Sequence, residues 1–159
     1  MRRANGVIAL VLIIFFSIHE ILGSLYLDDV ITAQLASLVW IGVILIGAHA
    51  ALSAITSRQM LTDPVRPPSK KKRIHLTKKW ASGILVAFFL VFHIVTNISS
   101  LKFGWISLLL ALALVIHICI SSKSLAKDLS LPNIFKWVFR IASIAIIIGA
   151  AVMIFLRIF

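Results

Sequence analysis

Five long apolar stretches dominate this chain of 159 residues, 61% of which are hydrophobic. They lie at 5–27, 34–57, 80–99, 104–122 and 137–156, and each is close to or above the roughly 20 residues that a helix needs to cross a bilayer. A backbone inside the hydrocarbon layer must satisfy its own hydrogen bonds, so these stretches fold as helices. The sequence therefore predicts an all-α integral membrane bundle of five transmembrane helices, with residues 1–159 forming a single domain.

The first stretch follows Arg2 and Arg3, an arrangement that secretory signal peptides also have. It carries His19 and Glu20, and no convincing small-residue cleavage site follows it, so we interpret it as a real span.

The basic residues are distributed unevenly along the chain, whose net charge is +11. If the N-terminus is cytoplasmic, fourteen of the sixteen lysines and arginines lie inside, and only Lys102 and Arg157 lie outside. This bias predicts a cytoplasmic N-terminus in a multi-pass protein of the inner (plasma) membrane. It also accounts for the charge without nucleic acid, which we do not expect as a partner.

One basic linker, residues 58–79, divides the chain into a hairpin of two spans and a unit of three. Its prolines disfavour helix, and its charges suit water or anionic lipid headgroups. Short turns at 28–33 and 99–103 make spans one and two, and spans three and four, antiparallel neighbours. Cys119, the only cysteine, lies in the fourth span, where we expect it to be a packing residue.

Each of the first four spans carries one histidine, at His19, His49, His93 and His117. An ionisable residue inside a membrane helix is costly and usually has a partner and a function. His19 and His93 each lie nine residues from the next outer charge, which places both about 13 Å below the outer boundary. His49 and His117 lie nine and six residues from the next inner charge, about 9–13 Å from the inner boundary.

The four histidines therefore form two levels with two members each. Two histidines at one level on facing helices can fill both axial positions of a haem iron, and such a haem carries electrons because no position stays open. The sequence predicts two stacked b haems, an outer one held by His19 and His93 and an inner one held by His49 and His117. Two other interpretations stay open: packing histidines that hydrogen bond between helices, and a zinc site, for which clustered ligands are scarce.

Other polar residues are candidates for quinone or proton contacts. Glu20 is the only acidic residue inside a span and adjoins the outer level. At the inner end, His75, Lys79, Trp80 and Ser82 supply the donors that quinone carbonyls need beside an apolar channel. The simpler interpretations are a hydrogen-bonded glutamate and an aromatic-and-basic belt at the membrane interface.

Two further cations, Arg58 and Lys78, are candidates to pair with the propionates of the inner haem. The positive-inside bias explains either residue equally simply.

The run Trp80-Ala81-Ser82-Gly83, followed ten residues after Gly83 by His93, resembles the basic-x-Ser-Gly…His opening of the cytochrome b anchors of succinate dehydrogenases and fumarate reductases. The five-span, four-histidine layout is similar to the single-chain dihaem members of that family. Two features depart from the family. The arginine usual in the motif is replaced, with Lys79 and Trp80 nearby, and the histidines fall on spans one to four rather than on one, two, four and five.

This resemblance implies a non-catalytic or quinone-reactive membrane-anchor subunit. Its partners would be a flavoprotein with covalent FAD and an iron–sulphur subunit at the cytoplasmic face, with membrane quinone as the substrate. Two alternatives remain: a stand-alone transmembrane electron conduit similar to cytochrome b561 or to flavinylation-associated cytochromes, and a non-redox membrane scaffold. The open face of the fifth span also allows a homo-oligomer.

Overall fold

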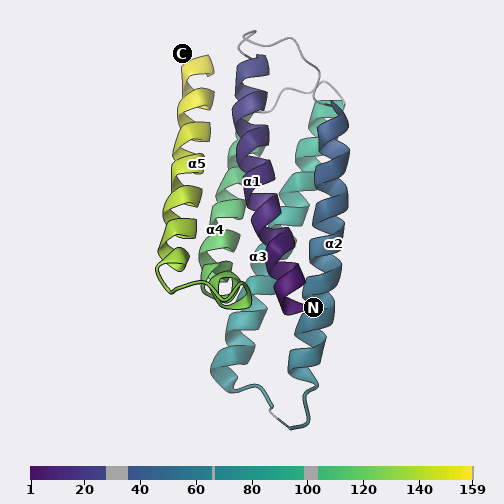
Figure 1. Ribbon diagram of the computed structural model, residues 1–159. Coiled ribbons are helices and arrows are strands. Elements are labelled where there is room, and N and C mark those ends of the chain that lie inside the picture. The colour runs from purple at the N-terminus through teal and green to yellow at the C-terminus, as the bar shows by residue number, and fades with distance from the viewer. Residues whose placement is uncertain (28–35, 66, 99–103, 159) are drawn as a thin grey trace. The chain divides into compact units, whose positions relative to one another are not determined.

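The structure is a computed structural model that describes residues 1–158 except 28–35, 66 and 99–103. Side chains at Glu20, 23–27, 36–39, 97, 98, 104, 147, 150, 151 and 153–158 also lie outside this description. The described chain forms five helices in order, α1 (Arg2–Leu27), α2 (Ala36–Leu61), α3 (Lys70–Ile98), α4 (Gly104–Asp128) and α5 (Phe135–Ile158) (Figure 1). The all-α prediction is confirmed, and each predicted span corresponds to one helix.

Helix α3 begins ten residues before the predicted span 80–99. Its first turn is capped by Ser69, which directly follows two prolines. The Ser69 hydroxyl oxygen accepts a hydrogen bond from the Lys72 backbone N–H at 3.3 Å, and its carbonyl accepts one from Arg73 at 3.0 Å. A serine in this position satisfies N–H groups that the helix start would otherwise leave without acceptors.

The predicted loop 58–79 is therefore too long, because only residues 62–69 separate α2 from α3. Helix α4 also continues beyond the predicted end at residue 122, to Asp128. The two extensions belong to the same end of the α3–α4 pair, and they bury Leu76, Leu125 and Ala126. Burial of apolar area stabilises these turns, although the basic residues at the start of α3 are unfavourable to the helix dipole.

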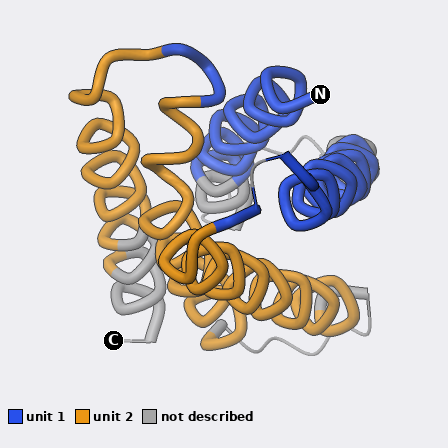
Figure 2. Tube along the Cα trace, turned by 90° about the horizontal axis from the view of Figure 1, so that it is seen from below, with its two compact units in different colours: residues 1–68, 128–130 blue, residues 69–127, 131–159 orange. Residues whose placement is uncertain are grey.

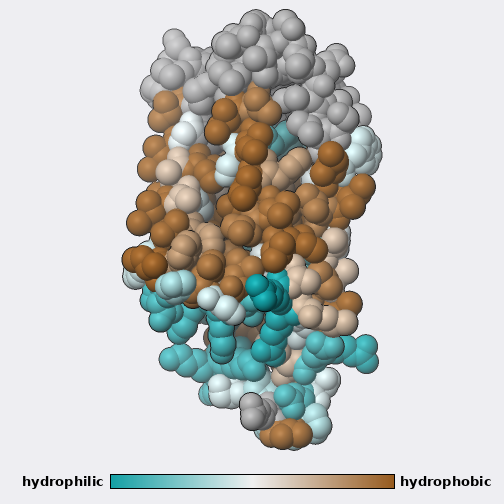
Figure 3. Space-filling model, viewed as in Figure 1, coloured by the Kyte–Doolittle hydropathy of each residue, from teal (hydrophilic) through white to brown (hydrophobic). Residues whose placement is uncertain are grey.

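Four helices are long and apolar enough to cross a membrane, within the windows Arg2–His19, Trp40–Leu61, Lys70–Thr96 and Trp105–Asp128. On the face that Figure 3 shows, apolar residues cover a broad part of the described helical surface. Exposed apolar surface of this extent is unsuited to water and fits a lipid environment. Membrane crossing by α5, a cytoplasmic N-terminus and the identity of the membrane remain predictions.

The chain divides into two compact units at the linker (Figure 2). Unit 1 comprises residues 1–68 and 128–130 and contains α1 and α2; unit 2 comprises 69–127 and 131–159 and contains α3, α4 and α5. The boundary falls inside the linker that the sequence places between a two-helix hairpin and a three-helix unit. Each unit is described below by itself.

In unit 1, α1 and α2 pack against each other as an antiparallel pair. Asn5, which is buried, donates from its amide to the Ser53 hydroxyl at 3.2 Å. Further along, a Cβ at Gly42 would lie 2.7 Å from Cε1 of Phe15, closer than real Cβ contacts allow. Glycine at this position is what lets the Phe15 ring approach the α2 backbone.

In unit 2, Arg140 joins α5 to α4. Its Nε donates to the Ser122 hydroxyl at 3.0 Å, and its Nη2 donates to the Cys119 carbonyl at 3.3 Å. Ser122 is fully buried; its hydroxyl donates to the Cys119 carbonyl at 3.1 Å and accepts from Arg140, so both of its roles are satisfied. The Cys119 side chain is half-buried.

Candidate functional site

Each of the three histidines in unit 2 hydrogen bonds to a serine on the neighbouring helix. The Nε2 atom of His75 lies 3.1 Å from the Ser124 hydroxyl oxygen, and Nδ1 of His117 lies 2.9 Å from that of Ser82. The Nδ1 atom of His93 lies 3.1 Å from the Ser107 hydroxyl oxygen. From one pair to the next, the number of residues advanced along α3 equals, to within one residue, the number of residues by which the partner moves back along α4. The pairs therefore also fix the antiparallel register of the two helices.

The bond between His117 and Ser82 has a defined direction. The Ser82 hydroxyl donates its only hydrogen to the Lys79 carbonyl at 3.0 Å, so Ser82 can only accept from His117. Nδ1 of His117 must then carry a hydrogen, and in the neutral ring Nε2 carries the lone pair. This is the tautomer in which a neutral histidine binds a metal through Nε2 while its other nitrogen is oriented by a hydrogen bond.

The residue after Ser82 leaves room for the same imidazole. A Cβ at Gly83 would lie 3.3 Å from Cε1 and 3.7 Å from Nδ1 of His117, tighter than most real contacts. Ser82 therefore orients the ring, and Gly83 leaves the space that the ring needs; we call these two residues the cradle of His117. Sequence reasoning singled out this Ser-Gly pair for quinone contacts and for the family resemblance, but the structure brings it to His117.

His93 and His75 use opposite ring nitrogens. His93 bonds through Nδ1, as His117 does, whereas His75 bonds through Nε2. A histidine held through Nδ1 can present Nε2 to iron, and one held through Nε2 cannot do so without giving up its bond. The geometry thus separates the two predicted ligands of unit 2 from His75, which the sequence did not place among the ligands.

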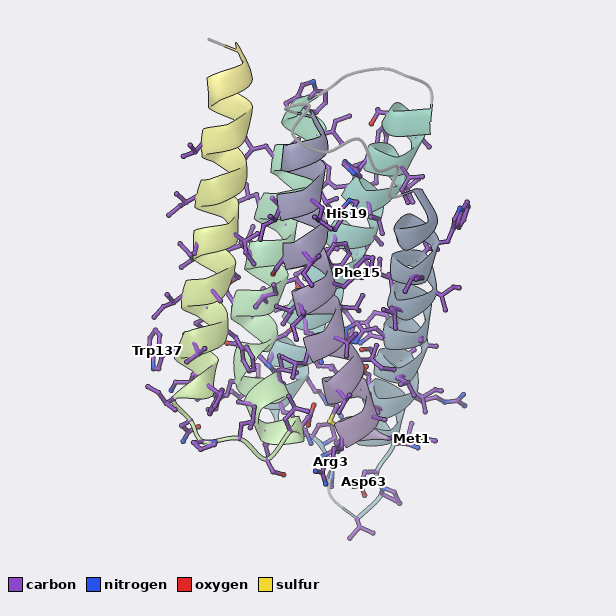
Figure 4. All side chains as sticks on the ribbon, turned by 45° about the horizontal axis from the view of Figure 1, so that its top comes forward. Met1, Arg3, Phe15, His19, Asp63 and Trp137 are labelled. Carbon is purple, nitrogen blue, oxygen red and sulfur yellow. The ribbon has the colours of Figure 1, made fainter. Side chains whose placement is uncertain are left out.

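In unit 1, His19 stacks on Phe15 with parallel rings, an interplanar angle of 4° and centroids 6.3 Å apart. Figure 4 shows the two residues on successive turns of α1. The His19 Nδ1 atom is buried and has no hydrogen-bond partner among the residues whose placement is described. A buried polar atom in this condition costs free energy and needs a partner. His49 is half-buried on α2.

The two histidines of each hairpin lie at different levels. In unit 2, His117 is level with Ser82, and His93 lies eleven residues further along α3, a rise of about 16 Å. In unit 1, the Asn5–Ser53 pair puts His49 level with residue 9, ten residues before His19 on α1, a rise of about 15 Å. The hairpins thus share one histidine spacing.

The predicted ligand pairs, His19 with His93 and His49 with His117, each take one residue from each unit. The distances within these pairs therefore lie outside what the structure describes. Within the described ranges, no cluster of three or more His, Cys, Asp or Glu side chains is suited to a metal ion. That finding bears on a zinc site, which needs such a cluster, and not on a haem iron with two axial histidines.

The remaining predicted residues are placed as follows. The Glu20 side chain lies outside the described part of the chain. Arg58 and Lys78 are exposed, near the end of α2 and in the early turns of α3 respectively. Lys79 is half-buried and Trp80 is 40% exposed. Arg58 belongs to unit 1, and Lys78, Lys79 and Trp80 belong to unit 2, so their roles at a haem or a quinone stay predictions.

Sequence reasoning missed the serines that orient the histidines. Ser107 and Ser124 belong to the site only because antiparallel packing brings them opposite His93 and His75. Ser121 lies one turn from His117 on α4, and its hydroxyl oxygen is buried with no hydrogen-bond partner among the described residues. The only signal of Ser121 and Ser124 in the sequence is helical spacing, since positions 117, 121 and 124 share one face of α4.

No protein-family model, curated protein or solved structure matches the chain. The fold and the site therefore define the class of protein by themselves. It is an all-helical protein with four helices long and apolar enough to cross a membrane, and its α3–α4 pair holds histidines in hydrogen bonds to serines.

Proposed function

We propose that the chain is a membrane cytochrome b subunit that carries electrons through two b haems. Its axial ligands are His19 with His93 at the outer level and His49 with His117 at the inner level. The N-terminus is cytoplasmic, and the protein lies in the plasma membrane. Bound haem would supply a one-electron carrier without an open coordination position.

The observation that supports this proposal most directly is the cradle of His117. Ser82 and the Lys79 carbonyl together fix the tautomer with the lone pair on Nε2. Gly83 leaves the space that the ring occupies. Oriented, neutral imidazoles of this kind are the usual haem ligands in helical membrane proteins.

Two further observations agree with a pair of haems. The two histidines of each hairpin are separated by nearly the same rise, about 15–16 Å. If the histidines of the two hairpins lie at the same depth at one level, they therefore also do so at the other level. The Nδ1 atom of His19 is buried and has no partner among the described residues, so a ligand or another polar group must satisfy it. The residues of this chain therefore fit haem as the group they would hold.

We further propose that the electron partners are a flavoprotein and an iron–sulphur subunit of the succinate dehydrogenase or fumarate reductase type, with quinone as the membrane substrate. This part is supported by the resemblance over residues 75–93 alone. Glu20, His75, Lys79, Trp80 and Ser82 are the candidates for quinone or proton contacts, and His75 and Ser82 would make such contacts beside their bonds to α4. Arg58 and Lys78 keep their proposed role at the haem propionates.

A second function, a membrane scaffold without haem, is favoured by one observation. All three histidines of unit 2 already bond to a serine across the α3–α4 interface, and such bonds by themselves stabilise helix association in lipid. Under this alternative the histidines serve packing, and the protein binds no cofactor.

The deciding experiment is a reduced-minus-oxidised spectrum of protein purified after expression with haem supplied, with haem quantified per chain. Two b haems per chain support the proposal. One haem would limit it to a single ligand pair, and folded protein without haem would leave the scaffold. Co-purification of the flavoprotein and iron–sulphur subunits separates a dehydrogenase anchor from a stand-alone conduit, which would reduce an extracytoplasmic acceptor without them.

A further inference from the structure

The first turns of α5 hold two cations against one indole. The Lys136 Nζ atom lies 5.5 Å from the centroid of the Trp137 ring, and the Arg140 Cζ atom lies 5.1 Å from it. Trp137 is half exposed, and Figure 4 shows its side chain projecting outward from α5 near the start of the helix. The three residues together form what we call the Trp137 cation cluster.

Arg140 is held in place from the opposite side. Its bonds to the Ser122 hydroxyl and the Cys119 carbonyl use two of its five N–H donors. The remaining donors stay with a side chain whose position is already fixed, so little conformational entropy is lost when an acceptor binds.

The positive charge of the cluster has no carboxylate partner among the residues that the structure places. Arg140 contacts neutral acceptors and an aromatic ring, and Lys136 contacts the same ring. A guanidinium beside membrane-depth helices without a counter-ion is unfavourable, and an anion that reaches it is stabilised.

The helix start itself contributes little to anion binding here. The backbone N–H groups of Phe135, Lys136 and Trp137 already donate to the carbonyls of Pro132, Asn133 and Ile134. The side chains of the cluster, rather than free amides, therefore supply the donors.

The depth of the cluster indicates where its anion comes from. Tryptophan prefers the headgroup level of a bilayer, and long cationic side chains reach toward phosphates from just inside the boundary. Arg140 bonds to Cys119 and Ser122, which lie two and five residues after His117 on α4, toward the basic C-terminal end of that helix. That places it about 3–8 Å closer to the membrane boundary than the histidine.

We propose that Lys136, Trp137 and Arg140 form a binding site for the headgroup of an anionic phospholipid. The two cations bind the phosphate oxygens, Arg140 through its remaining fork donors, and the indole packs against the glycerol region. The site concerns lipid recognition by α5 and does not depend on haem.

Native mass spectrometry of protein extracted from vesicles of equal phosphatidylcholine and phosphatidylglycerol content tests this site. Wild-type protein retains phosphatidylglycerol in preference to phosphatidylcholine. Lys136→Gln lowers that preference about fivefold, the value for one cation near an anionic surface, and Arg140→Gln lowers it by at least as much. Lys136→Gln leaves the contact with α4 intact, so it remains informative if Arg140→Gln does not fold.

Lys127→Gln is the matched control, because Lys127 is an exposed cation of the same unit that lies in the last turn of α4, outside the Trp137 cation cluster. A diffuse attraction would give Lys127 the same effect as Lys136, so a specific site predicts that Lys127→Gln changes the preference clearly less than Lys136→Gln does. Equal retention of the two lipids by the wild type overturns the proposal. An equal loss in Lys127→Gln and Lys136→Gln also overturns it, since it would show a diffuse charge effect instead of a site.

Discussion

The α1–α2 and α3–α4 hairpins carry their membrane-depth histidines at nearly the same spacing, yet they surround them differently. In α3–α4, His93 and His117 each have a serine on the opposite helix that bonds Nδ1. In α1–α2, His19 has an aromatic neighbour on its own helix and a buried Nδ1 without a described partner. In α3–α4 the serines orient the two histidines without any bound group, whereas in α1–α2 the proposed haem would supply part of that order.

The largest expected effect comes from the histidines themselves. His117→Ala and His93→Ala should each remove one b haem and one transition in a redox titration, because each deletes an axial ligand. His49→Ala should reproduce the first loss and His19→Ala the second. His75→Ala is the control and should keep both haems, since His75 is bonded through Nε2. Loss of the same transition in His93→Ala and His117→Ala would show that the two levels are wrongly assigned.

The next effect concerns orientation within α3–α4. Ser82→Ala removes the acceptor of His117 Nδ1–H, and loss of such an outer partner typically weakens metal binding about 10- to 100-fold. The measurement is haem transfer to an apo-haem acceptor protein, followed by the decay of the Soret band. Ser124→Ala removes the matching partner of His75 and should leave the transfer rate unchanged. If both variants lose haem equally fast, the effect is general loosening of the α3–α4 interface.

A smaller effect tests packing in α1–α2. Gly42→Ala places a Cβ 2.7 Å from Phe15 Cε1, which should cost about 1–2 kcal/mol of unfolding free energy through overpacking. Because Phe15 stacks on His19, the outer haem should also change its spectrum. Gly47→Ala is the control, with no atom within 4 Å of the added Cβ, and better helix propensity should make it neutral or stabilising. Denaturation in detergent, followed by far-UV circular dichroism, measures both.

The smallest effect is expected at the cradle of His117. Gly83→Ala brings a Cβ to 3.3 Å from Cε1 of the ring, so the imidazole must shift by a few tenths of an ångström, at a cost below about 1 kcal/mol. Thermal unfolding of the haem-free protein should therefore rank Gly83→Ala as milder than Gly42→Ala. The reverse order would mean that the α3–α4 interface is the more tightly packed of the two.

The sequence by itself determined that the chain is helical and suited to a membrane, because apolar stretches of this length satisfy their backbone hydrogen bonds only as helices. It also located the division between the two units and the spacing of the histidines, since both follow from residue counts along stiff elements. The α3 start was missed because prolines and charges favour a loop locally, while the Ser69 cap and packing of Leu76 extend the helix.

Only the tertiary structure decided which groups meet the histidines. Ser107 and Ser124 are ordinary positions on an apolar helix until the antiparallel register of α3 and α4 brings them opposite His93 and His75. The contact of Ser82 with His117 appears for the same reason, and its predicted contact with quinone stays a prediction. A shift of one residue turns a helix face by about 100°, so a partner across an interface depends on packing that no local pattern encodes.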